Sequence, residues 1–180
     1  MNRASSELNT IKRTTSLEHT KWYMGMLLTH LVDEQDTNGA FSLLEATVVP
    51  GTEPPPHVHS REDELFYVLE GQFDVYVGDK TFSVIAGECI FLPRLKPHAF
   101  VIRSPELRVL ILYTHAGLED AFRSVSVPAQ RLELPHWALT YSMSDIDLTT
   151  RRFADYGVHI LAPHEVAQRL PTYPQPLPRS

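Results

Sequence analysis

Between Lys21 and Thr114 the chain is a succession of short apolar segments, each separated from the next by residues that favour turns. Apolar and β-branched runs of this length are typical of β-strands, and the intervening glycine, proline and asparagine residues end them. The expected strands cover residues 22–32, 41–49, 65–69, 73–77, 81–85, 89–92, 98–102 and 109–114. Many short strands without alternating helices predict an all-β sandwich or barrel rather than an α/β fold.

Three of these segments carry further expectations. Glu70 and Gly71 separate the strands at 65–69 and 73–77, and this dipeptide predicts a hairpin turn between them. The segment 22–32 is apolar on both alternating faces, which is more than one wall of a barrel requires. We therefore expect one face of this segment to pack on a neighbouring subunit, so that the protein is a homodimer.

Helical patterns appear only after Thr114, at residues 117–125, 145–156 and 163–170. Gly157 is placed to end the second helix. We expect a flexible N-terminal arm over residues 1–16, a barrel over 17–117, and a C-terminal helical extension with a proline-rich tail over 118–180. The last ten residues alternate with prolines, and we expect them not to pack.

Composition excludes several classes of protein. The chain of 180 residues has a net charge of −6, which is a poor match for nucleic acid, and its apolar runs are far shorter than the ~20 residues that span a bilayer. The N-terminus has basic residues but no apolar segment behind them, unlike a secretory signal. The single cysteine, Cys89, fits a reducing compartment. We expect a cytoplasmic protein that binds neither nucleic acid nor membranes.

Histidine and acidic residues gather in one stretch, from Gly51 to Gly71. Side chains two residues apart in a strand point the same way, so His57 and His59 face one side together and offer imidazoles to a metal ion. A third imidazole can come from His98, which begins a separate apolar strand behind Pro97. The competing interpretation is that these histidines are exposed strand residues at a rim.

The carboxylate partner is left open by this pattern, because Glu62, Asp63 and Glu64 are consecutive. If Glu64 points inward, Phe66 and Val68 also point inward and form an apolar lining. An inward Asp63 would instead bring Leu65 and Tyr67 to the interior, which periodicity alone permits.

The spacing of Gly51, His57, His59, Glu64 and Gly71 resembles the first cupin motif, G-x5-H-x-H-x3–4-E-x6-G. The spacing of Gly87, Pro93 and His98 resembles the second cupin motif, G-x5-P-x-G-x2-H-x3-N. Together the two motifs place the resemblance over roughly residues 40–115. It implies a cupin-type jelly-roll barrel whose metal ligands are His57, His59, Glu64 and His98. Leu95 stands where the family usually has glycine and Ile102 where it often has asparagine, which puts the local loop shape and the polarity near the site in doubt.

Imidazole and carboxylate ligands suit a divalent transition metal, namely Fe, Mn, Ni, Co, Cu or Zn. We expect an apolar, aromatic pocket beside it that takes a small molecule and is lined by Phe66, Val68, Phe73, Val75 and Phe100.

The flanking sequence, PPPHVHSREDELFYVLEG, is similar to bacterial single-domain proteins related to quercetin 2,3-dioxygenase. This similarity implies a dioxygenase acting on an aromatic or enolic small molecule such as a flavonol, with Glu64 as a ligand and general base. The alternatives are a non-catalytic metal-binding cupin that binds or senses a small molecule, and a metal-assisted isomerase.

Overall fold

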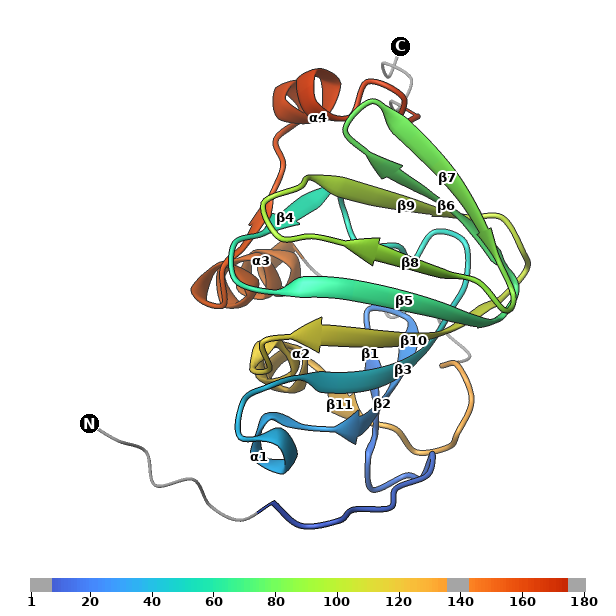
Figure 1. Ribbon diagram of the computed structural model, residues 1–180, viewed down its shortest axis with the longest axis vertical. Coiled ribbons are helices and arrows are strands. Elements are labelled where there is room, and N and C mark those ends of the chain that lie inside the picture. The colour runs from blue at the N-terminus through green and yellow to red at the C-terminus, as the bar shows by residue number, and fades with distance from the viewer. Residues whose placement is uncertain (1–7, 136–142, 175–180) are drawn as a thin grey trace.

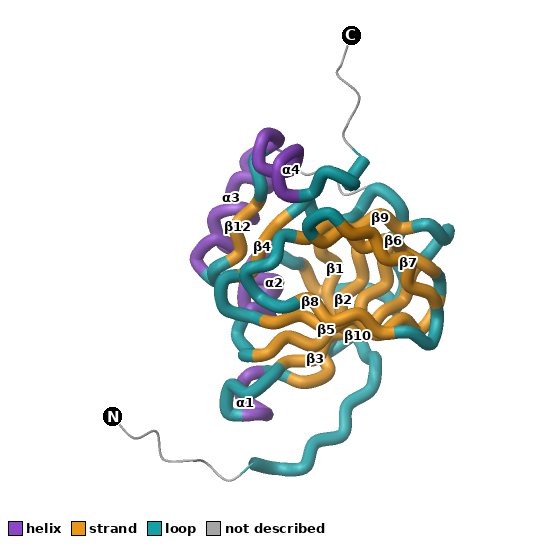
Figure 2. Tube along the Cα trace, turned by 45° about the horizontal axis from the view of Figure 1, so that its top comes forward, coloured by secondary structure: helices purple, strands orange, loops and turns teal. Residues whose placement is uncertain are grey.

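The computed structural model of the protein describes residues 8–135 and 143–174. The described chain folds into two antiparallel sheets that face each other, with helices gathered on one side of the strands (Figures 1 and 2). The larger sheet has the order β11 (Val127–Pro128), β1 (Thr20–Tyr23), β2 (Met26–Val32), β3 (Ser42–Val48), β10 (Leu107–Thr114), β5 (Asp63–Glu70), β8 (Cys89–Leu92). The smaller sheet has the order β12 (Val158–Ile160), β4 (His57–His59), β9 (His98–Ile102), β6 (Gln72–Val77), β7 (Lys80–Ile85). These sheets confirm the expected all-β jelly roll.

The core lies between the two sheets because the strands bury every second residue. β3 and β10 alternate strictly between buried and half-buried positions. Leu44 and Val109 of the larger sheet and Phe73 and Val75 of the smaller sheet are almost wholly buried in one shared cluster. Each such side chain stabilises the fold by roughly 1.5–3 kcal/mol relative to its exposed state.

The expected hairpin at Glu70 and Gly71 is wrong. β5 pairs with β10 and β8, whereas β6 pairs with β9 and β7, so this turn carries the chain from one sheet to the other. The corner is tight: a Cβ on Gly71 would lie 2.4 Å from the carbonyl oxygen of Glu106 and 2.5 Å from Oγ of Ser104. The sequence pattern indicates a turn here but not which strands the turn connects.

The apolar segment 22–32 is also not one strand. Met24 and Gly25 have φ angles of 48° and 82°, and these left-handed residues close a hairpin between β1 and β2. The outer face of this hairpin is covered from within the chain, because Trp22 and Leu27 pack with Ala129 in one buried cluster. The apolar excess of this segment therefore does not by itself require a neighbouring subunit.

The C-terminal extension contributes to both sheets as well as providing helices. α2 (Leu118–Val125), α3 (Met143–Asp155) and α4 (Pro163–Arg169) lie where helices were predicted, in addition to the short α1 (Glu34–Thr37). β11 and β12 were not predicted. They add a strand beside β1 and a strand beside β4.

The two ends of the described chain are held to the body. Arg13 of the expected flexible arm forms an ion pair with Asp36 and donates a hydrogen bond to the carbonyl oxygen of Leu31 at 3.2 Å. Tyr173 lies in the tail that was expected not to pack, yet its ring meets that of Tyr76 edge-on at 5.3 Å. Residues 1–7 of the arm and 175–180 of the tail lie outside the described residues. No helix in the described ranges is long and apolar enough to cross a membrane.

Gly71→Ala is expected to lower the free energy of unfolding by about 2–4 kcal/mol, because the new methyl group would overlap the Glu106 backbone at the corner. Gly78→Ala is a matched control, since Gly78 also has a positive φ of 60° but has nothing within 4 Å of its Cβ position. The control should lose only about 1 kcal/mol. Urea unfolding of both variants measures the difference, and equal losses would contradict the steric explanation.

Candidate metal centre

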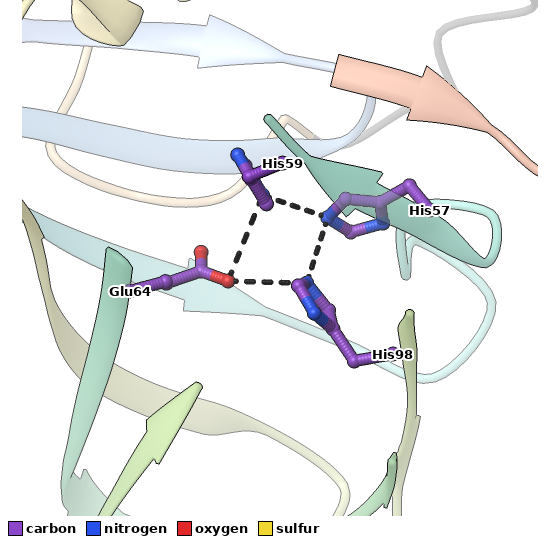
Figure 3. A group of neighbouring side chains, drawn as sticks. All are labelled: His57, His59, Glu64 and His98. Carbon is purple, nitrogen blue, oxygen red and sulfur yellow. Dashed lines mark hydrogen bonds and ion pairs between the residues drawn. The ribbon is translucent and has the colours of Figure 1, made fainter. Parts of the chain in front are cut away.

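Three neighbouring strands bring four buried polar side chains to one point. β4 presents His57 and His59 from the same face, β9 presents His98 directly opposite His57, and β5 presents Glu64 from the facing sheet. Each of these four side chains is at least 94% buried. Figure 3 shows the three imidazoles and the carboxylate pointing toward a common centre. The structure therefore brings together all four residues that the sequence singles out as metal ligands.

The separations between the ligand atoms fit a bound transition metal. Nε2 of His57 lies 3.1 Å from Nε2 of both His59 and His98. Oε2 of Glu64 lies 3.3 Å from Nε2 of His98 and 3.8 Å from Nε2 of His59. A metal with bonds of ~2.0–2.2 Å holds neighbouring ligand atoms roughly 3.0–3.5 Å apart. Three of these four separations fall in that range and the fourth slightly exceeds it.

Hydrogen bonds on the far side of two rings fix which nitrogen faces the centre with a lone pair. Nδ1 of His57 lies 2.8 Å from the carbonyl oxygen of Pro55, and Nδ1 of His98 lies 3.1 Å from that of Lys96. A carbonyl oxygen only accepts, so both Nδ1 atoms carry the proton and both Nε2 atoms carry a lone pair. Two lone pairs 3.1 Å apart repel each other unless a cation lies between them.

The electrostatics of the site favour the forms that bind metal. Burial lowers the pKa of His57 well below its usual value, and the neighbouring His98 and His59 act in the same direction, so this imidazole is neutral at pH 7. Burial alone would raise the pKa of Glu64, but the close approach of His98 and the other nearby histidines outweigh it and lower the pKa to about 2. The site thus holds a neutral imidazole beside an ionised carboxylate.

The three consecutive acidic residues have three different positions. The sequence pattern allowed either Glu64 or Asp63 to point inward. In the structure Glu64 points inward, together with Phe66 and Val68. Asp63 points outward and accepts hydrogen bonds from Arg94, at 2.8 Å from its backbone nitrogen and 2.7 Å from its guanidinium, and these bonds lower the pKa of Asp63 to about 2.

Glu62 is buried beneath the site. Its Oε2 lies 3.5 Å from Nδ1 of His59, on the far side of the ring from Glu64. Neither of these two buried atoms has another hydrogen-bond partner within standard limits, so the Nδ1–H of His59 is placed to donate a hydrogen bond to Oε2 of Glu62. A carboxylate behind a metal-binding imidazole fixes the orientation of the ring and makes it a stronger donor.

The two departures from the motif leave the site intact. Leu95 adopts a φ of 66°, the left-handed conformation that glycine favours, and its amide donates to the carbonyl oxygen of His59 at 2.8 Å. The loop is therefore formed with leucine at a cost of roughly 1–2 kcal/mol. The backbone nitrogen of Ile102, where asparagine is common, donates to Oε1 of Glu53 at 2.9 Å.

A cavity of about 380 Å³ opens beside the four residues, and its walls are mostly apolar. His57, His59 and Glu64 reach its surface together with Tyr113. The expected aromatic side chains Phe66, Phe73 and Phe100 line it. Val68 and Val75 were expected in the lining, but they do not reach the cavity because they are wholly buried deeper in the core.

The C-terminal extension completes the cavity. Phe153 of α3 and Val158 and Ile160 of β12 form part of its wall. β12 is fixed beside the site because it pairs with β4, in the register Val158 to His59 and Ile160 to His57. The extension therefore covers one side of the barrel mouth next to the histidines.

Sequence reasoning missed two residues of the site. Its position in an apolar strand does not distinguish Tyr113 from a packing residue, but it lies opposite Glu64 in the β10–β5 register. Burial raises the pKa of Tyr113 well above its usual value and the Glu64 carboxylate adds to the rise, so the phenol keeps its proton. Glu62 was considered only as a rival to Glu64. Finding either role requires knowing which strands pair and how the loop before β5 folds.

Comparisons with known proteins agree with this architecture. Residues 44–115 match the family model described as the cupin domain. An uncharacterised protein of Methanocaldococcus jannaschii is 35% identical over 57 residues, which cover 32% of this chain and 46% of that protein. The chain thus spans about half the length of this curated relative.

Two solved structures show similar folds. KdgF from Halomonas sp. has a TM-score of 0.52 and 20% identity, over 60% of this chain and 96% of that one. The nucleoside dehydratase Pac13 of Streptomyces has a TM-score of 0.49 and 18% identity, over 61% of this chain and 88% of that one. At 20% identity the likeness to KdgF shows the fold alone.

A divalent transition metal added to chelator-treated protein is expected to raise the free energy of unfolding by about 2.7 kcal/mol at a hundredfold excess over Kd. For a chain of this length the melting temperature should rise by roughly 5–10 °C. His57→Ala should abolish the rise, whereas His164→Ala, at an exposed position outside the cluster, should leave it unchanged. Calorimetry with Mn, Fe, Co, Ni, Cu and Zn ions measures the shift, and an equal rise in both variants would contradict the assignment.

Glu62→Gln is expected to weaken metal affinity roughly 10-fold and Glu62→Ala up to about 100-fold, because His59 loses its carboxylate partner. Glu165→Gln is a matched control, since Glu165 pairs with the exposed His159 at 3.1 Å away from the cluster. Competition against a chelating dye measures the affinities. Unchanged affinity in both Glu62 variants would show that His59 is oriented without it.

Proposed function

We propose that this chain, whose residues 44–115 match the cupin domain, is a metal-dependent dioxygenase acting on an aromatic or enolic small molecule, such as a flavonol. One observation carries the proposal: three imidazoles and a carboxylate converge at one buried point, and His57, His59 and Glu64 of this group line a cavity of about 380 Å³ whose walls are mostly apolar and include several aromatic rings. A cavity of this size accepts a small organic molecule and favours a flat, apolar one.

His57, His59, Glu64 and His98 would hold the cation. When bound, a transition metal at such a site supplies Lewis acidity and, if it is redox-active, a path for electrons between substrate and dioxygen. The remaining chemistry rests on the side chains and on the shape of the cavity.

Phe66, Phe73 and Phe100 would bind the substrate and exclude water. Their rings form one cluster, with centroids 5.0–5.9 Å apart, along the wall beside His57. A flat ring system stacked on this wall would direct its hydroxyl group toward the polar end of the cavity. Removal of water there strengthens each polar contact with the substrate.

Glu64 is the proposed general base. Its carboxylate is buried, ionised and reaches the cavity, so in addition to holding the cation it would be placed to accept the proton of a phenolic or enolic hydroxyl group. Tyr113 lies beside it with a protonated phenol, which is placed to donate a hydrogen bond to the oxygen that loses this proton.

The overall reaction balances with dioxygen as the co-substrate. The carbon–carbon double bond of the enol is cleaved. One oxygen atom ends in a carboxylic acid and the other in a carbonyl group, and dioxygen accepts the four electrons that the substrate loses. The proton taken up by Glu64 returns to the carboxylic acid.

Two other functions would use the same four residues. A binding or sensing protein would show ligand-induced stabilisation without a product, and a metal-assisted isomerase would give a product with the mass of its substrate. The isomerase is the weaker alternative, because sugars and keto acids require polar groups and this cavity is mostly apolar.

Oxygen uptake by metal-loaded protein with flavonols and simple enols tests the proposal. We expect uptake and the incorporation of both atoms of ¹⁸O₂ into products. Glu64→Gln should lower turnover at least about 100-fold through loss of the base and a ligand, and His57→Ala should abolish it. Phe82→Ala, on the exposed strand β7, is the control and should retain full activity. Uptake that survives His57→Ala, or stabilisation by ligand without uptake, would refute a dioxygenase at this site.

A further inference from the structure

The cavity beside the metal centre has walls from two parts of the chain. Residues 44–115, which match the cupin domain, supply the four candidate metal ligands and the aromatic wall formed by three phenylalanines. A second wall lies outside this match and includes Tyr23 of β1, Phe122 of α2 and Phe153 of α3. Because the ligands belong to the first part alone, the second wall can change which substrate fits without changing the metal site.

The helix α3 presents one side to the cavity. Ile146, Thr149, Thr150 and Phe153 line it, and their spacing of i, i+3, i+4 and i+7 places them on one face of the helix. Phe153 is only 8% exposed, whereas Ile146 is 40% exposed. The cavity-facing side of α3 therefore begins at the water-exposed mouth of the cavity and ends inside it.

Phe153 is held in place by two other rings of the same wall. Its ring stacks on that of Tyr23 with centroids 5.9 Å apart, and it meets the ring of Phe122 edge-on at 4.8 Å. Tyr23 and Phe122 also meet edge-on, at 5.2 Å. Each ring contacts the other two, so the wall is already ordered before a ligand binds, and a flat ligand that packs on it loses little additional entropy.

This wall lies away from the metal centre. A series of ring contacts runs from His59 to Tyr113 at 6.0 Å, from Tyr113 to Phe122 at 6.3 Å, and from Phe122 to Phe153 at 4.8 Å. Figure 2 shows α3 beside β12, which in turn pairs with the histidine strand β4. A substrate whose acidic hydroxyl group reaches the metal centre can therefore contact Phe153 only with a part of the molecule far from that group.

The same side of α3 adds polar groups to a mostly apolar cavity. Thr149 is half-buried and Thr150 is exposed, and both line the cavity about one helical turn before Phe153. A threonine hydroxyl can donate and accept a hydrogen bond, so it can bind a hydroxyl or a carbonyl group without requiring a charge. A few polar groups on an otherwise apolar wall fix the orientation of a ligand and provide specificity.

We propose that the cavity-facing side of α3 determines substrate specificity. Phe153 packs against a ring of the substrate, and Thr149 and Thr150 form hydrogen bonds with a polar substituent at the end of the molecule away from the metal centre. The substrate class is thereby narrowed to aromatic enols that carry a hydroxyl or carbonyl group at their far end, in preference to small enols. This inference rests on the proposed function.

Binding under nitrogen, where dioxygen is absent and no turnover occurs, tests the role of Phe153. The metal-loaded full chain is titrated with the unsubstituted flavonol and with acetylacetone, a small enol. Phe153→Ala should raise the Kd of the flavonol roughly 10-fold or more through loss of the ring contact and change that of acetylacetone less than about twofold. Phe153→Leu keeps most of the apolar volume and should raise the flavonol Kd roughly 3–5-fold, which keeps the test valid if the alanine variant fails to fold.

The matched control is Leu148→Ala. Leu148 lies on α3 but is 45% exposed and outside the cavity lining, so this variant should bind the flavonol as the wild type does. The metal-induced rise in melting temperature should be the same in all of these variants. An equal loss of affinity for both ligands in Phe153→Ala and Phe153→Leu, or no loss in either variant, would overturn the role of Phe153.

The threonines are tested with two flavonol derivatives, one hydroxylated on the fused ring and one on the pendant phenyl ring. At least one derivative should bind the wild type roughly fivefold more tightly than the unsubstituted flavonol, and the combined change Thr149→Val and Thr150→Val should remove this gain. The affinity for the unsubstituted flavonol should stay within about twofold, because valine keeps the shape of threonine. A wild type that gains from neither hydroxyl group, or a gain that survives in the double variant, would overturn the proposal.

The two proposals fail in different ways. Binding with the expected dependence on α3 but without oxygen uptake would refute the dioxygenase and leave the specificity wall standing. Oxygen uptake with flavonols that is insensitive to every change on α3 would refute the specificity wall and leave the dioxygenase standing. Absence of flavonol binding to the metal-loaded wild type would refute both.

Discussion

Three imidazoles and a carboxylate converge at one buried point, and the strands around them must accommodate this cluster. Two of the rings must present lone pairs to each other, because carbonyl oxygens take their Nδ1 protons. Buried lone pairs in contact are costly without a shared cation, so the arrangement of these strands is suited to holding a metal ion. β4, β9 and β5 come from both sheets, and their meeting point therefore also holds the two sheets together.

The C-terminal extension completes the site, although it lies far from the histidines in the sequence. The backbone nitrogen of Leu161 donates a hydrogen bond to the carbonyl oxygen of Pro56, and the backbone nitrogen of Ser60 donates one to the carbonyl oxygen of Gly157. These bonds lie just beyond the two ends of β4 and fix β12 beside it. A Cβ on Gly157 would lie 2.4 Å from Oγ of Ser60, so the close approach requires glycine. The helix that precedes this turn then supplies Phe153 to the cavity wall.

The larger sheet has different chemistry on its two faces because side chains alternate along each strand. On β5, Glu64 and Phe66 face the cavity while Leu65 and Tyr67 face outward. On β10, Tyr113 lies inside while Leu110 and Leu112 lie outside. A shift of one residue in either strand would exchange the two faces, so the register that places the carboxylate also decides which side chains face outward.

The sequence determined the strand-rich fold, the three later helices and the three histidines of the centre, because periodicity acts over short distances, and the resemblance to the cupin motif added Glu64. Tertiary structure decided which strands became neighbours. It turned Glu70 and Gly71 into a corner between sheets, placed Glu62 behind His59 and Tyr113 beside Glu64, and added β12 next to the site. These features depend on pairings between residues distant in the chain, and a single sequence contains no local signal that selects one pairing over another.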